Sequence, residues 1–205
     1  MAEKIQSAEL LIVYPNCIDG VDFRNPDGSR TEKNYGMTFA IDSDNPFIEK
    51  LRESLIAALI EKFQLKPDSK EMEKALDNNF PLVAVEDHDT LSTVPRLKGM
   101  TLIRTKAKQP VHPVHIDDLE TLIEDQEQIT TGDFGVAVLN PFAYTFGGKK
   151  GVSLYLSAFC KTGNGPTFKV GNQDFNKLFK GIDKSALTMS AKAKEEVSDE
   201  IKNLM

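Results

Sequence analysis

The chain has 205 residues, of which 40% are hydrophobic and 27% charged, and its formal net charge at pH 7 is −6. This length and composition fit one compact domain with a buried core and exclude a wholly disordered chain. No apolar run approaches the roughly 18 residues that span a bilayer, the first residues do not form a secretory signal, and the two cysteines cannot make a disulfide framework. We therefore expect a protein of a reducing compartment with no membrane partner.

The first part of the chain predicts two strands and one strong helix. An apolar run at 8–14 and an alternating run at 35–41 are typical of strands, and the Asn-, Asp-, Gly- and Pro-rich residues between them are typical of a loop. Asn45 is expected to cap a helix whose first residue is Pro46, and apolar residues then recur at helical spacing up to Phe63. Residues 68–78 form a weaker, charged helix candidate.

The second part of the chain predicts mostly strands. Residues 80–98 look irregular apart from 82–85, residues 99–108 are expected to form a strand, and residues 111–131 form a long polar excursion. Two long strands follow at 134–146 and 151–161, and the Gly-rich connection between them predicts a hairpin. One helix with a small curved sheet favours a mainly β fold: an OB-fold-like five-stranded barrel with one packed helix and a long hairpin extension. We assign this domain to residues 1–181 and a polar, mobile tail to residues 182–205.

The charge is unevenly distributed, which allows a basic surface on an acidic protein. Residues 109–133 contain seven acids and no Lys or Arg, whereas residues 96–108 contain five bases and no acid. All five bases occupy even positions, so one unbroken strand would place them on the same face. The alternative is a solvated edge strand that lysines protect against aggregation. The five bases are Arg96, Lys98, Arg104, Lys106 and Lys108.

Strand 151–161 also divides into two faces. Even positions from Val152 to Cys160 are apolar and are expected to face inward, while odd positions carry Ser, Tyr, Phe and Lys side chains. A two-residue turn at Gly148-Lys149 would pair Tyr144 with Ser153 and Phe142 with Tyr155, and we expect a bulge at Pro141. This register predicts one exposed aromatic face; the alternative is that the rings cover a second small core under residues 109–133. The rings of this face are Phe142, Tyr144, Tyr155 and Phe159.

Aromatic rings on an open sheet beside Lys and Arg side chains indicate a surface for single-stranded nucleic acid, because bases stack on rings and cations attract phosphates. The sequence shows no credible catalytic centre and no need for a cofactor or metal, so we do not expect an enzyme. The candidate nucleic-acid-binding residues are Arg96, Lys98, Arg104, Lys106, Lys108, Phe142, Tyr144, Lys149, Lys150, Tyr155, Phe159 and Lys161.

Two acidic or histidine-containing clusters leave a metal-dependent nuclease as an alternative. Glu86-Asp87-His88-Asp89 is one, and His112-x-x-His115 followed by Asp117-Asp118 is the other. Four consecutive side chains cannot all converge on one ion, and the prolines at 110 and 113 favour an extended segment whose side chains diverge. We interpret both clusters as polar loops.

Three stretches, taken in order, carry a resemblance to a known family. They are Tyr35–Ile41 running into the 44–63 helix, Gly99–Pro110 (GMTLIRTKAKQP), and Thr131–Lys161 with its aromatic Phe142-Ala143-Tyr144 and Gly-Lys hairpin. Together these stretches cover roughly half of the chain. The chain resembles the OB-fold single-stranded-DNA-binding proteins encoded by tailed phages.

The resemblance implies a protein that coats single-stranded DNA during phage DNA replication and recombination in the cytoplasm of the bacterial host. It also implies an acidic C-terminal tail that contacts phage replication or recombination proteins. Here residues 182–205 hold five acids and four lysines, so the tail departs from that pattern. A virion structural or scaffolding protein, using the same aromatic face for protein contacts, is the competing interpretation.

Overall fold

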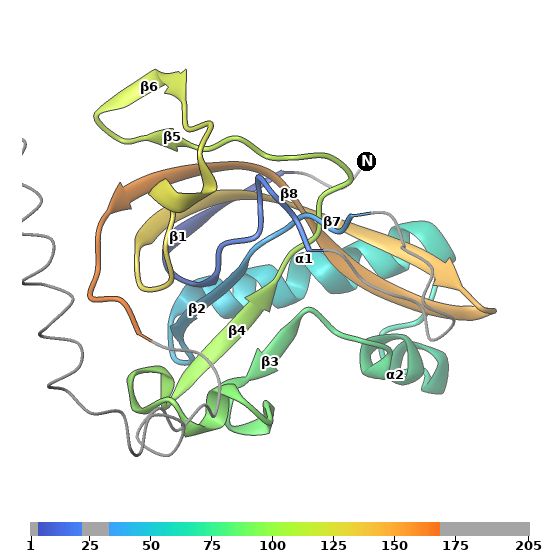
Figure 1. Ribbon diagram of the computed structural model, residues 1–205. Coiled ribbons are helices and arrows are strands. Elements are labelled where there is room, and N and C mark those ends of the chain that lie inside the picture. Colours follow the sequence, from blue (N-terminus) through green and yellow to red (C-terminus); the bar gives the residue numbers. More distant parts are fainter. Residues whose placement is uncertain (1–3, 22–32, 169–205) are drawn as a thin grey trace, which may run out of the picture. The chain divides into compact units, whose positions relative to one another are not determined.

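A computed structural model describes residues 4–21 and 33–168 (Figure 1). The predicted tail at 182–205, and its boundary with the domain, lie outside these residues. The described strands form one eight-stranded sheet in the order β3-β4-β2-β1-β7-β8-β5-β6. In the described ranges, no helix is both long and apolar enough to cross a membrane.

Five of the strands close into a ring, as the OB-like prediction requires. They are β1 (Ile5–Tyr14), β2 (Thr38–Asp42), β4 (Met100–Arg104), β7 (Phe134–Phe146) and β8 (Lys149–Gly163). Antiparallel pairs join β4 to β2, β2 to β1, β1 to β7 and β7 to β8. The ring closes where Lys106, just beyond β4, runs parallel to β8: its N–H donates to Leu154 O and its carbonyl accepts from Leu156 N, both at 2.9 Å. The predicted five-stranded OB-like barrel is confirmed.

Helix α1 (Pro46–Phe63) packs against the barrel and begins where the sequence predicts. The Asn45 side chain accepts a hydrogen bond from Phe47 N at 2.9 Å, and Pro46 occupies the first turn, where a missing N–H leaves no hydrogen bond unmade. The apolar stripe, including Leu51, Leu55 and Leu59, is buried in the barrel core. The weaker candidate is a helix too: α2 (Lys70–Asp77), capped by Ser69.

The strand predicted at 99–108 is shorter than expected, and both faces of the strand that forms are buried at Thr101, Leu102 and Ile103. Strand β4 covers only residues 100–104, because residues 95–97 form a 3₁₀ turn and Gly99 has a positive φ of 77°. Ile103 points into the barrel, while Leu102 points outward into a second cluster with Leu91 and Leu97. That outer cluster forms because the 3₁₀ turns of residues 85–97 fold over the sheet; β3 (Leu82–Ala84) precedes them. The prediction of one continuous row of basic side chains is therefore wrong.

The β7–β8 hairpin is present, with its turn one residue earlier than predicted. Gly147 and Gly148 form the two-residue turn, with φ of 57° and 77°, so Phe142 pairs with Ser153 and Tyr144 with Gly151. The shift moves each pairing by two positions, so Phe142 and Tyr144 stay on the predicted face of the hairpin. The predicted bulge is present, but it lies between Val138 and Leu139 rather than at Pro141, and it leaves Ser157 without a partner on β7. Beyond Ser157 the faces of β8 are therefore exchanged.

The polar excursion contains structure that the sequence did not predict. Strand β5 (Val114–His115) lies parallel to β8, and β6 (Asp118–Leu122) folds back on β5. A 3₁₀ turn at Gln126–Gln128 leads into β7. The β5–β6 hairpin projects above the barrel (Figure 1). Every residue of β6 is exposed, which explains why the sequence shows no alternating pattern there.

Candidate nucleic-acid interface

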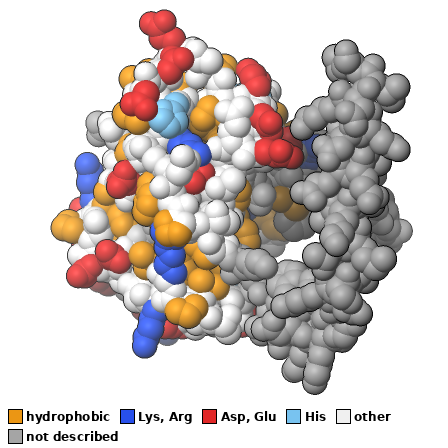
Figure 2. Space-filling model, turned by 60° about the vertical axis from the view of Figure 1, so that its left-hand side comes forward, with side chains coloured by type: hydrophobic (Ala, Val, Ile, Leu, Met, Phe, Trp, Pro, Cys, Tyr) orange, Lys and Arg blue, Asp and Glu red, His pale blue; other side chains and the backbone are white. Residues whose placement is uncertain are grey.

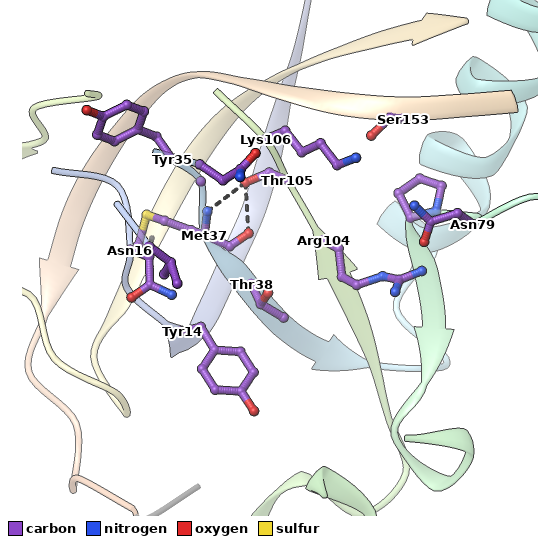
Figure 3. Close-up of a pocket in the computed structure, with 14 residues that line it drawn as sticks. Tyr14, Asn16, Tyr35, Met37, Thr38, Asn79, Arg104, Thr105, Lys106 and Ser153 are labelled. Atoms are coloured by element: carbon purple, nitrogen blue, oxygen red, sulfur yellow. Dashed lines mark hydrogen bonds between the residues drawn. The ribbon is translucent and has the colours of Figure 1, made fainter. Parts of the chain in front are cut away.

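An open groove of about 460 Å³ lies on the outside of the barrel, beside the junction between β4 and β8. The loop that follows β1 forms one side, and the chain leaving β4 forms its floor (Figure 3). Both aromatic and cationic side chains open into it. Its lining includes Tyr14, Asn16, Asn34, Tyr35, Thr38, Asn79, Arg104, Lys106 and Ser153.

Arg104 is held in place as the half-buried cation of the groove. Its guanidinium donates to Phe80 O, and its backbone N–H donates to Pro81 O at 2.9 Å. Thr38 lies directly across the β2–β4 ladder from it. Burial lowers the pKa of Arg104, but an arginine remains protonated at any physiological pH. The groove therefore contains a fixed positive charge whose direction is set before any ligand arrives.

Lys106 supplies an exposed cation on the backbone segment that closes the barrel. The neighbouring Thr105 hydroxyl donates to Met37 O at 2.8 Å and accepts from Met37 N at 2.9 Å, which ties this segment to the loop before β2 (Figure 3). Gly36 makes the close approach possible, because a Cβ there would lie 2.3 Å from Thr105 O and its φ is +145°. The wall and the floor of the groove are thus locked together.

An aromatic pair continues this outer face on the β7–β8 hairpin. Phe142 and Tyr155 stack with ring centroids 3.7 Å apart and planes 10° apart, and Tyr144 lies 6.1 Å from Phe142. Lys106 forms its bridge directly opposite Tyr155, so the pair adjoins the groove. Phe142 covers one face of Tyr155, and the Lys108 ammonium lies over the same ring, 5.9 Å from its centroid. The structure brings the predicted Arg104, Lys106, Lys108, Phe142, Tyr144 and Tyr155 into one region.

Phe159 and Lys161 do not belong to this face, contrary to the prediction. Phe159 is 2% exposed and packs in the barrel core, 5.5 Å from Phe39. Lys161 is 7% exposed, and its ammonium lies 2.8 Å from the Asp133 carboxylate and donates to Gln128 O at 2.6 Å. Burial alone would raise the pKa of Asp133, but hydrogen bonds from Lys161 and Thr130 outweigh it and lower that pKa. The bulge at Ser157 is the cause, because it reverses the parity of every residue after it.

The remaining predicted cations lie away from the groove. The Arg96 guanidinium lies 5.8 Å from the Phe134 ring centroid and 5.5 Å from that of Phe168, and it donates to Pro166 O. Lys98 is exposed beside Gly99, at the end of the 85–97 segment. Lys149 is exposed at the hairpin tip, whereas Lys150 pairs with Glu71 at 3.2 Å. A nucleic-acid role for these four residues stays a prediction.

Sequence reasoning missed the groove residues contributed by loops. Tyr14 and Tyr35 flank a segment classified only as a loop, and Asn79 follows α2 with a positive φ of 59°. Tyr35 begins the run predicted as a strand at 35–41, yet it makes only an isolated bridge to Ala107. Aromatic residues at both ends of a long loop are the signal that could have indicated this wall.

The two candidate metal clusters do not assemble. In the parts of the chain that the structure describes, no group of three or more His, Cys, Asp or Glu side chains converges. His112 pairs with Glu124 at 3.1 Å, and His115 with Asp117 at 3.3 Å. Glu86 accepts from Gly99 N at 2.8 Å, and this hydrogen bond lowers the pKa of its carboxyl group.

Comparison with solved structures finds the same fold in two phage proteins. The structure resembles the single-stranded-DNA-binding protein of bacteriophage Enc34 in complex with single-stranded DNA, with a TM-score of 0.62 and 14% identity over 81% of this chain and 89% of that one. It also resembles gp2.5, a single-stranded-DNA-binding protein encoded by bacteriophage T7, with a TM-score of 0.53 and 15% identity over 89% of this chain and 96% of that one. At such identities these likenesses show a shared fold.

No curated protein matches the chain. A family described as the single-stranded-DNA-binding protein of Enterobacter phage Enc34 matches residues 13–188, which is most of the sequence. The same span holds the groove and the aromatic pair. The chain therefore belongs to the Enc34-type family of phage single-stranded-DNA-binding proteins.

Proposed function

We propose that this protein binds single-stranded DNA, with little preference for sequence, across the groove and the adjoining aromatic pair. The observation that carries the proposal is the continuity of one outer face, on which Arg104, Lys106, Tyr155 and Phe142 follow one another from β4 to β7. Cations beside stacking rings are what a flexible polynucleotide needs, and every base has a face that can stack. Family membership supports the same assignment.

The cations of this face are of two kinds, one fixed by hydrogen bonds and two exposed to solvent. Arg104 is oriented before binding and suits a phosphate that enters the groove, whereas the exposed Lys106 and Lys108 follow the backbone. The Tyr155 face under Lys108 becomes a platform for a base once that ammonium turns to a phosphate. We assign no bond-making step to this surface, so the protein acts by binding rather than by catalysis.

The biological setting follows from the family. We propose that the protein coats single-stranded DNA during phage replication and recombination in the cytoplasm of the infected bacterium, as a domain spanning residues 1–181. Residues 182–205 would contact other replication or recombination proteins.

A salt series tests the binding mode. Fluorescence anisotropy with single- and double-stranded oligonucleotides of equal length should show tighter binding to the single strand. Log affinity should fall against log salt with a slope of about −0.7 for each phosphate neutralised. The double variant Arg104→Glu/Lys106→Glu should flatten that slope and weaken binding, while Glu53→Lys on the exposed face of α1 should do neither. Tight binding whose strength does not change with salt would refute the electrostatic part.

A further inference from the structure

The β5–β6 hairpin presents an acidic and apolar surface that the groove does not use. Three large apolar side chains are exposed on it: Ile116 at 48%, Leu119 at 63% and Leu122 at 50%. Asp117, Asp118 and Glu120 lie among them. Figure 2 keeps this hairpin at the top of the view, where acidic side chains gather with hydrophobic ones between them. We call residues 114–122 the acidic hairpin.

The turn of the β7–β8 hairpin has the opposite character. Phe146 is 80% exposed, the highest value among the large hydrophobic side chains of the described residues, and Lys149 beside it is exposed. A Cβ added at Gly147 or Gly148 would meet nothing within 4 Å, so this end is open. We call residues 146–149 the basic tip. It extends from a different side of the barrel than the acidic hairpin (Figure 1).

We propose that the basic tip of one copy docks on the acidic hairpin of the next copy along single-stranded DNA. Phe146 would cover the apolar side chains around Leu119, and Lys149 would pair with Glu120 or a neighbouring acid. Charge complementarity carries the choice of partner, since residues 109–133 contain seven acids and no Lys or Arg, while the basic tip contains a lysine and no acid.

The geometry of the contact determines what it builds. Two different surfaces meet, so the contact is heterologous, and repetition gives an open row of copies rather than a closed dimer. Two hairpin ends bury far less than the roughly 1,200 Å² of a stable interface. The contact therefore holds only where DNA places copies side by side at high effective concentration. Its consequence is cooperative coating.

The test measures cooperativity with the full-length chain, and it rests on the proposed function. Binding is compared on the shortest oligo(dT) that holds one copy and on strands that hold two or more. The wild type should bind the longer strands more tightly per site. Phe146→Ala and Leu119→Ser should each lower that advantage by about tenfold or more, with unchanged affinity for the short strand and unchanged melting temperature. Glu120→Lys should lower it as well, whereas the matched Glu53→Lys should not.

Mixing the two apolar variants gives the sharpest result. A Leu119→Ser copy keeps its basic tip and a Phe146→Ala copy keeps its acidic hairpin. An equal mixture should therefore regain part of the cooperativity on a two-copy strand, since one of the four ordered pairings joins two intact surfaces. No gain on mixing overturns the proposal. A loss of cooperativity with Leu119→Ser but not with Phe146→Ala also overturns it, because the acidic hairpin would then contact a surface other than the basic tip. If Phe146→Ala weakens binding to the short strand as much as binding to the longer strands, the tip belongs to the DNA site, and that result also overturns the proposal. If the wild type does not bind either strand, the proposed function itself is refuted. If it binds the short strand but shows no cooperativity on longer strands, only this contact is refuted.

Discussion

Replacing Phe159 and Tyr155 one at a time separates the barrel core from the binding face, although the two residues lie only four positions apart on β8. Phe159 is buried against Phe39 and reaches over Gly135, where an added Cβ would meet its ring. Gly135 has no side chain that could fill the space left by the ring. We therefore expect Phe159→Ala to cost about 3–5 kcal/mol of folding free energy. For a domain of this size, that lowers the melting temperature by about 6–20 °C.

Tyr155→Ala should show the opposite pattern. The side chain is half-buried, so its removal costs the stacking with Phe142, about 0.5–1.5 kcal/mol of stability. The loss of a base platform should weaken binding to single-stranded DNA by about 1–3 kcal/mol, or roughly 5- to 150-fold. One thermal melt and one titration per variant decide the matter. The reasoning is refuted if Phe159→Ala keeps the wild-type melting temperature, or if Tyr155→Ala destabilises the fold without weakening binding.

Three further variants test other parts of the structure. Asp133→Asn should cost about 3–5 kcal/mol at pH 7, since it leaves Lys161 buried without a charge partner. Because folding lowers the Asp133 pKa, the wild type should lose this advantage as pH falls below about 4, where the carboxyl protonates in the unfolded chain before it does in the folded one; melts of both proteins from pH 7 to 3 measure this loss. Gly36→Ala should lower the free energy of unfolding, measured with denaturant, by more than about 1 kcal/mol, because the added Cβ would push the loop away from Thr105. Asn45→Ala should cost about 1 kcal/mol by removing the α1 cap, and unchanged unfolding would contradict that role.

The elements predicted well are those whose signals are local. Asn45 and Pro46 define the start of α1 by themselves, and two glycines define the β7–β8 turn to within one residue. Phe142, Tyr144 and Tyr155 share a face because moving the turn by one residue changes the pairing by two positions, which preserves parity. These features need no knowledge of the rest of the chain.

The errors arise where distant residues decide. Ser157 bulges opposite β7, and nothing in the sequence around it announces the extra residue, so Phe159 and Lys161 were placed on the wrong face. Leu102 has the same even parity as the five bases, and no local pattern shows that residues 85–97 cover it. The groove combines loops with strands, so the wall formed by Tyr14 and Tyr35 had no periodicity to reveal it.

The 85–97 segment that covers Ala40 and Leu102 has a geometric consequence for a bound strand. It occupies the outer surface of β2 and β4 beyond Thr38 and Arg104, so a polynucleotide in the groove meets a barrier on that side. The open course runs the other way, past Lys106 toward the β7–β8 hairpin. On this path, the number of nucleotides that one copy protects is set by the span from this barrier to the stacked pair of Phe142 and Tyr155. Removing that pair, rather than altering the barrel, is the change that would shorten the footprint.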